Sequence, residues 1–136
     1  LTKVASGGEL ARAMLALRLV LSGHGTPGDG TSGDEAGTYV FDEVDAGIGG
    51  TAAAAVGAAL AEVGRRHQVL VVTHLAQVAA EADAQLVVSK HVAGGTTTTA
   101  VERVVGDERI AELARMLSGD EGGEAARRHA AELLAR

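Results

Sequence analysis

Two short apolar segments with an Ala-rich stretch between them constrain the fold more than any other feature of this sequence. Residues 38–41 and 68–73 are rich in residue types that favour β-strands, and residues 52–65 are Ala-rich and favour a helix. Two strands joined by a helix of this length normally pair in parallel, through a right-handed crossover. A short helix over residues 75–82 and a third strand over residues 85–90 continue the same order. We therefore predict an α/β fold with a largely parallel sheet flanked by helices.

The segments that precede the first strand are expected to form a helix and a loop. Ser6 followed by Glu9 is a capping-box pattern, and the helix that it begins is expected to run to about Leu21. Residues 23–37 are rich in Gly, Thr, Ser and Asp and contain the one Pro, which is typical of a loop. Four apolar residues of the expected helix share one face at spacings of three and four: Leu10, Met14, Leu17 and Leu21.

The pattern changes after the third strand. Residues 96–105 alternate weakly between polar and apolar, and we expect them to pair with residues 86–92 through a turn at Ala93–Gly95. Helices are expected over residues 107–117 and 124–134, with a Gly-rich break between them.

The composition limits the core, the partners and the compartment. With 136 residues the chain fits one domain or one lobe, and with one Tyr and one Phe its core must be filled by Ala, Val and Leu. The absence of Cys excludes disulfides and Cys-based zinc sites. A net charge of −6 argues against a surface that neutralises many DNA phosphates, and we interpret the basic runs at residues 65–67 and 127–129 as solvated helix faces. No apolar run reaches the roughly 18 residues of a membrane span, so the chain is expected to be soluble.

An acid pair follows the first strand. Asp42 and Glu43 would lie at the carboxyl edge of the parallel sheet, where ligands bind in such folds. Asp42 would hold the Mg²⁺ of MgATP, directly or through water, because Mg²⁺ prefers hard oxygen ligands. Glu43 would orient and deprotonate the attacking water as a general base. Taken alone, the pair also fits an acidic strand end that leads into a turn.

A Gly-rich segment precedes the first helix. In Ser6–Glu9, Gly7 and Gly8 would allow the backbone to approach an anion closely, and the amides at the helix N-terminus would point at a phosphate. Ser6 would add a hydroxyl donor. Taken alone, the segment also fits a plain capping box after a Gly turn.

A histidine and a second Gly-rich turn complete the polar residues at the strand ends. His74 follows the second strand and could hydrogen-bond a γ-phosphate or the attacking water from the sheet edge; alone, it also fits an ordinary, partly exposed polar residue. Because Asp42 and His74 follow consecutive strands joined by one crossover, both can face one site. Residues Asp45–Gly50 form either a dimer-contact loop or a connector.

The order of these motifs is more specific than any one of them. Ser6–Glu9, then Tyr39–Glu43, then Val71–His74 resemble the C-terminal half of an ATP-hydrolysing head of the ABC/SMC type. No Gly-x-x-x-x-Gly-Lys-Ser/Thr loop, the usual cradle for nucleotide phosphates, occurs in the sequence. Since the chain also starts at Leu1 rather than Met, we expect it to be a piece of a longer ATPase, in which the preceding lobe supplies that loop.

The chain resembles the RecN family of bacterial SMC-like DNA repair ATPases, and the resemblance covers essentially the whole chain. The residues that carry it form four segments: Lys3–Arg12, Phe41–Gly50, Gln68–Ala79 and Glu112–Gly119.

This resemblance implies roles for the residues that match the family's motifs. Residues Ser6–Glu9 would be the ABC signature, which contacts the γ-phosphate of an ATP held by the other subunit. Asp42 and Glu43 would be the Walker B pair, Asp45 would lie in the D-loop and bind the nucleotide, and His74 would be the switch histidine. ATP and Mg²⁺ are the implied cofactors. The complete protein would form a homodimer through ATP-sandwiched heads and act on DNA in the recombinational repair of double-strand breaks, with recombination proteins as further partners.

The resemblance further implies a missing N-terminal lobe joined by a coiled coil, and a cytoplasmic, nucleoid-associated location with no membrane partner. The isolated chain is expected to hydrolyse almost no ATP. Ala11, Gly49 and Ala76 stand where the family usually has Ser, Ser and Pro, which puts only local loop geometry in doubt.

Three alternatives remain open at this point. A transporter nucleotide-binding subunit shares all three motifs but more often has Gln where this chain has Glu9. Another SMC-type chromosome protein is a closer alternative, and the stretch Thr73–Ala79 favours RecN over it. A non-catalytic dimerisation module is the third alternative, against which Glu43 argues because a head without hydrolysis does not need that carboxylate.

Overall fold

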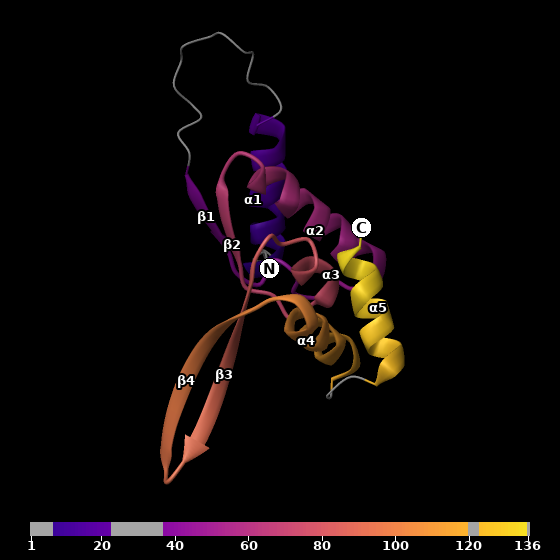
Figure 1. Cartoon of the computed structure of the whole chain (residues 1–136). Helices are drawn as coiled ribbons and strands as arrows, with labels where there is room; N and C mark the ends of the chain where they lie inside the picture. The colour runs from indigo at the N-terminus through magenta and orange to yellow at the C-terminus, as the bar shows by residue number, and fades with distance from the viewer. Residues whose placement is uncertain (1–6, 23–36, 120–122, 136) are drawn as a thin grey trace. The chain divides into compact units, whose positions relative to one another are not determined.

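The computed structural model describes residues 7–22, 37–119 and 123–135 (Figure 1). The chain divides into two compact units, Leu1–Glu81 and Ala82–Arg136. Each unit has its own packed elements, and the polar residues singled out above as site residues all belong to the first.

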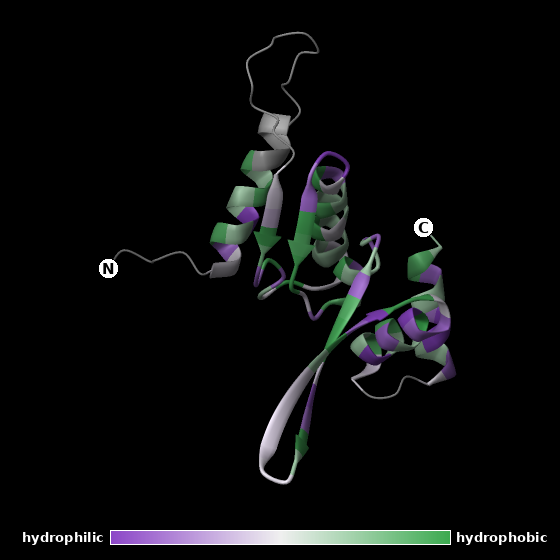
Figure 2. Ribbon diagram, turned by 60° about the vertical axis from the view of Figure 1, so that its left-hand side comes forward, coloured by the Kyte–Doolittle hydropathy of each residue, from purple (hydrophilic) through white to green (hydrophobic). Residues whose placement is uncertain are grey.

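The first unit contains the expected parallel strand pair. Strand β1 (Thr38–Phe41) pairs in parallel with β2 (Gln68–Val71), in a register that sets Thr38 opposite Gln68 and Phe41 opposite Val71. Helix α2 (Gly50–Gly64) is the crossover between them, and the short helix α3 (Ala76–Ala79) follows β2. Figure 2 shows β1 and β2 side by side with hydrophobic carboxyl ends. The sequence prediction of a strand, a crossover helix and a parallel strand is confirmed.

Helices cover one face of this strand pair. Tyr39, Phe41, Val69 and Val71 alternate along the strands and pack against helix residues, as the period of two for a strand requires. On the opposite face Val40, Leu70 and Val72 are exposed. The buried residues of this core come from the first helix, the end of β1, the turn after it, α2 and α3: Leu15, Phe41, Val44, Ala53, Leu60, Val63 and Val78.

Helix α1 (Gly7–Ser22) forms over the expected residues but presents an unexpected face to the core. Gly8 and Leu15 are buried and Ala11 packs against the core, whereas three of the residues predicted to share the apolar face are exposed. The small residues Gly8 and Ala11 allow the helix to approach closely, and Leu15 lies on the same face at helical spacing. The exposed residues are Leu10, Met14 and Leu17. The side chain of Leu21 lies outside the described residues.

The second unit contains a β-hairpin rather than a third parallel strand. Strand β3 (Gln85–Ala93) pairs antiparallel with β4 (Thr96–Val104), and Gly94 and Gly95 turn the chain at φ values of 58° and 79°. Two successive residues with positive φ match the twist of a tight hairpin, which glycine permits without strain. The prediction of this hairpin is confirmed. The expectation that the third strand would extend the parallel pair is not met, because among the described strands β3 pairs only with β4.

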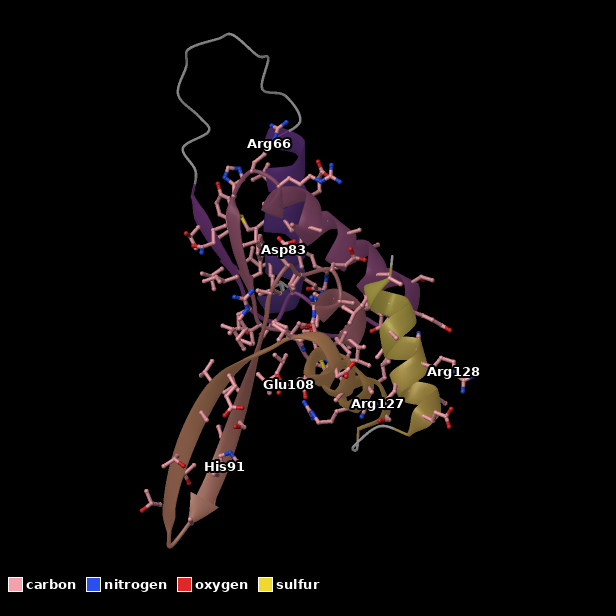
Figure 3. The ribbon with its side chains drawn as sticks, in the orientation of Figure 1. Arg66, Asp83, His91, Glu108, Arg127 and Arg128 are labelled. Carbon is pink, nitrogen blue, oxygen red and sulfur yellow. The ribbon has the colours of Figure 1, made fainter. Side chains whose placement is uncertain are left out.

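Two helices complete the second unit. Helix α4 (Gly106–Ser118) packs against α5 (Glu124–Leu134) and buries Leu113, Ala114 and Ala130 completely. Within the ranges that the structure describes, no helix combines the length and the apolar character that crossing a membrane requires. The basic residues of the second run are exposed on α5, where Figure 3 labels Arg127 and Arg128, in agreement with their interpretation as a solvated helix face.

Close packing of α2 on α3 depends on Gly57. A Cβ added there would lie 3.1 Å from the backbone O of Gln77 and 3.0 Å from Cγ of Glu81, so α3 would have to shift. We expect Gly57→Ala to lower the free energy of unfolding by about 1 kcal/mol, because overpacking against α3 outweighs the higher helix propensity of Ala. Gly64→Ala in the same helix is the matched control, since no atom lies within 4 Å of its added Cβ. Thermal melting of both variants checks this; equal melting temperatures would contradict tight packing at Gly57.

Candidate active site

The carboxyl ends of β1 and β2 meet at one edge of the strand pair. The pairing continues one residue past β2, where the backbone N–H of Val72 donates to O of Phe41 at 2.9 Å. Beyond this point β1 leads into the turn 42–48, and β2 leads into Thr73 and His74. The polar residues that the sequence placed after two consecutive strands therefore do converge on one edge, as parallel pairing requires.

Asp42 and Glu43 are both exposed at the start of this turn. Glu43 has φ of 56°, and it is the one non-glycine residue with positive φ in the described part of the chain. A left-handed conformation at a non-glycine residue costs on the order of 1 kcal/mol or more, and such strain concentrates at functional sites. The backbone thus holds Glu43 in a conformation that an ordinary connector would avoid.

Asp45 is the most highly connected polar residue of the site. Its side chain is 4% exposed, and its Oδ2 atom accepts hydrogen bonds from the Thr73 hydroxyl and, at 3.0 Å, from the backbone N–H of His74. Nδ1 of His74 lies 3.2 Å from the same oxygen. The backbone N–H of Leu75 donates to the Thr73 hydroxyl oxygen at 3.0 Å. Asp45 therefore joins the turn after β1 to the end of β2.

These contacts settle the charge of Asp45. Burial alone would raise the pKa of this carboxyl, but hydrogen bonds from Thr73 and His74 favour the ionised form, and the balance holds the pKa below the ordinary value of 3.8. The lowered pKa means that the ionised carboxylate stabilises the folded chain above pH 3.8, and that this stabilisation is lost as the pH falls toward the lower folded-state pKa. At neutral pH Asp45 is a buried anion that can only accept hydrogen bonds.

The N-terminus of α1 packs onto the same turn. Gly8 is buried, and a Cβ added to it would lie 2.7 Å from the backbone O of Glu43 and 2.9 Å from Cβ of Ala46. A Cβ added to Gly7 would lie 2.9 Å from Oε2 of Glu43, so the Glu43 carboxylate points toward the start of the helix. Glu9 is exposed in the first turn of α1. Ser6 lies outside the described residues.

The sequence prediction assigned no role to Arg12, although it contacts the site. Its Nη1 atom donates to the backbone O of Val44 at 3.1 Å and to that of Ala46 at 2.9 Å. Arg12 lies four residues after Gly8 and so shares its face of α1. Because both partners of Arg12 are backbone carbonyls, no residue type in the sequence signalled this contact. Arg12 holds the turn from the α1 side, as Thr73 and His74 hold it from the β2 side.

Some of the predicted site residues contact one another in the structure, and others do not. Asp45 contacts His74, and the carboxylate of Glu43 lies beside Gly7. Among the residues that the structure describes, no hydrogen bond or ion pair links Asp42 to His74, although both lie after neighbouring strands. The His74 side chain is 73% exposed, so its ring is held by Asp45 rather than by packing.

The residues present fit Mg²⁺ bound together with a nucleotide. In the described ranges no group of three or more His, Cys, Asp or Glu side chains could enclose a metal ion. Mg²⁺ in nucleotide sites usually needs one or two carboxylates and takes its other ligands from phosphates and water. An exposed Asp42 at the strand end meets that requirement.

Sequence comparison shows that this chain is similar to part of a DNA repair protein found in several bacteria. No family model matches the chain. Over 134 residues the chain is 52% identical to DNA repair protein RecN of Streptomyces coelicolor and 54% identical to that of Mycobacterium leprae, and over 135 residues it is 53% identical to that of Deinococcus radiodurans. These matches cover 98% to 99% of this chain but only 21% to 22% of each relative, so the chain spans about a fifth of the length of the proteins it matches.

The fold also has a counterpart among solved structures. A structure from work on ATP-driven dimerization and DNA-stimulated activation of SMC ATPases superposes with a TM-score of 0.51 at 21% sequence identity. The match covers 84% of this chain and 63% of that one. At this identity the similarity establishes the fold alone, so the chain shares the α/β fold of that structure.

Proposed function

We propose, from the 52% to 54% identity of this chain to part of the DNA repair protein RecN, that it forms the C-terminal lobe of an ATP-hydrolysing head. In the complete protein this head would dimerise around ATP and act in the recombinational repair of DNA double-strand breaks. A lobe that supplies the phosphate loop and a coiled coil would come from the rest of the protein. DNA is the proposed partner of the complete protein, with recombination proteins as further partners.

One observation carries this proposal: an exposed acid pair and a held histidine lie at the same edge of a parallel strand pair. Asp42 and Glu43 follow β1, His74 follows β2, and the two strands are direct neighbours. A parallel sheet collects its ligand-binding residues at this edge. ATP hydrolysis needs a metal-binding carboxylate and a base near the attacking water, and the acid pair offers both.

We assign the site residues the following roles. Asp42 would hold the metal of MgATP, which when bound would neutralise charge on the phosphates. Glu43 orients the attacking water and takes its proton. His74 contacts the γ-phosphate or that water from the neighbouring strand.

The N-terminus of α1 is proposed to bind the ATP held by the other subunit. The first turn of a helix attracts an anion through its backbone N–H groups and its dipole, and Gly7 at the start of α1 is exposed. Ser6 and Glu9 belong to this signature segment by their positions in the sequence. Because one chain holds only half of each such site, two copies are required for hydrolysis.

Blocking the signature segment tests the proposal. The protein required is a full-length RecN protein that carries this chain as its C-terminal segment, called the full-length protein below. We expect Ser6→Arg to abolish association that depends on ATP, because a bulky cation at the helix start obstructs the contact with the partner's nucleotide. Light scattering with and without ATP measures the association state.

The control for this variant lies on the same helix. Ala13 is exposed on α1, away from the N-terminus, so Ala13→Arg adds the same charge without touching the signature segment. It should associate with ATP as the wild type does. An ATP-dependent dimer of the Ser6→Arg protein would refute the role of this segment.

A further inference from the structure

Two hydrogen bonds and one further polar contact from a single segment converge on one oxygen of Asp45. The Thr73 hydroxyl and the backbone N–H of His74 donate to Oδ2, and the ring Nδ1 of His74 lies 3.2 Å from the same oxygen. The direction of the Thr73 hydrogen bond follows from its other contact. Since the N–H of Leu75 donates to the Thr73 oxygen, the hydroxyl proton of Thr73 is directed to the Asp45 carboxylate.

An ionised carboxylate oxygen at hydrogen-bond distance requires a proton on the facing nitrogen. A neutral imidazole carries one N–H, so a proton on Nδ1 leaves Nε2 as an acceptor. The geometry points to Asp45 as a positioning residue, which fixes His74 in the Nδ1–H tautomer and leaves Nε2 free to accept a hydrogen bond from the attacking water.

This inference rests on the proposed function for its catalytic meaning, and it narrows the role of His74. A γ-phosphate oxygen offers no proton to a neutral Nε2, whereas a water molecule does. Of the two contacts open to His74 in its neutral form, water is therefore the one that this tautomer allows. Packing cannot replace Asp45 as the holder of the ring, because 73% of the His74 side chain is exposed.

The tautomer can be measured in this chain without nucleotide. Long-range ¹H–¹⁵N correlation spectra at about pH 8, where ordinary histidines are neutral, distinguish Nδ1–H from Nε2–H rings. A His74→Gln variant assigns the signal, and the other histidines of the chain serve as references. We expect His74 to be predominantly the Nδ1–H form. A predominantly Nε2–H ring in the folded chain would overturn the inference, whatever the protein's activity.

Two variants distinguish an effect of Asp45 on the His74 tautomer from a general loss of folded structure. Asp45→Asn places an amide beside Nδ1 and should shift His74 toward the Nε2–H form. Thr73→Val removes the hydroxyl donor to Asp45 but keeps the carboxylate, so His74 should stay in the Nδ1–H form. Retention of Nδ1–H in a folded Asp45→Asn chain would contradict the role of Asp45. If that variant does not fold, the wild-type and Thr73→Val spectra decide the question.

Turnover of the full-length protein tests the catalytic consequence separately. Asp45→Asn should lower kcat about 10-fold or more with little change in KM, and adding it to His74→Gln should produce no further loss. If the kcat losses of the two single variants multiply in the double variant, Asp45 does not act through His74. Full activity of His74→Gln would instead count against the proposed function, while the spectra would still report whether Asp45 sets the tautomer.

Discussion

Replacing Glu43 by Gln in the full-length protein is expected to slow ATP hydrolysis about 100-fold or more while ATP binding persists. Gln keeps the size and the hydrogen-bonding capacity of the side chain but cannot take a proton from water. The loss should therefore appear in kcat rather than in KM, because the substituted group acts in the chemical step.

The local structure makes Glu43→Gln a clean substitution. Glu43 is exposed and its unusual φ of 56° is a backbone property, so an uncharged side chain of the same length leaves the turn in place. Glu102→Gln is a suitable control, because Glu102 is also exposed but lies on β4, in the other unit. Steady-state phosphate release and equilibrium binding of a fluorescent ATP analogue measure the two effects. If the Glu43→Gln protein hydrolyses ATP as fast as the wild type, Glu43 is not the general base.

Gly8→Ala is expected to destabilise the first unit by about 1–3 kcal/mol, which should lower the melting temperature by several degrees. The added Cβ would lie 2.7 Å from a backbone oxygen of the Glu43–Ala46 turn, a contact that no side-chain rotation can relieve. Helix α1 would have to move away from the turn and weaken the hydrogen bonds of Arg12 to Val44 and Ala46.

The neighbouring glycine supplies the matched control for Gly8. A Cβ added to Gly7 meets only Oε2 of Glu43, the far end of a flexible side chain that can turn aside. Gly7→Ala should therefore stay within about 1 kcal/mol of the wild-type stability. Thermal unfolding of the chain followed by circular dichroism compares the two variants. If both melt at the same temperature, α1 is not held against the turn as described.

Local patterns predicted most of the secondary structure. The crossover helix, the parallel strand pair, the hairpin and both C-terminal helices follow from residue type and spacing, because neighbours along the chain decide such elements. The face of α1 did not follow. Leu10, Met14 and Leu17 form the more hydrophobic stripe, but close approach to the turn selects the small residues Gly8 and Ala11. Burial here depends on which helix face fits a neighbouring turn, and the sequence of α1 does not contain that information.

The strand after α3 shows a second limit of local patterns. Alternating helices and strands suggested that β3 would join the parallel pair, yet the Gly94–Gly95 turn allows β4 to pair with it directly. A hairpin brings residues together that are close in the chain, whereas a further parallel strand needs a non-local contact.

The site was only partly predictable, for a related reason. Asp42, Glu43 and His74 were singled out because each lies shortly after an apolar strand. The partnership of Asp45 with Thr73 and His74 depends on the register of β1 against β2, which sets the two strand ends level. Arg12 was missed because its partners are backbone carbonyls, which leave no trace in the sequence.

ATP turnover by a split protein decides whether this chain completes an ATP-hydrolysing head. A full-length RecN relative lacking its matching C-terminal segment is purified and assayed alone, with this chain, and with its Glu43→Gln variant. If the chain completes an ATP-hydrolysing head, turnover appears only in the mixture with the wild-type chain and is lost with Glu43→Gln. Absence of turnover in that mixture, despite proven association of the two pieces, would exclude a catalytic role for this chain and favour a non-catalytic dimerisation module.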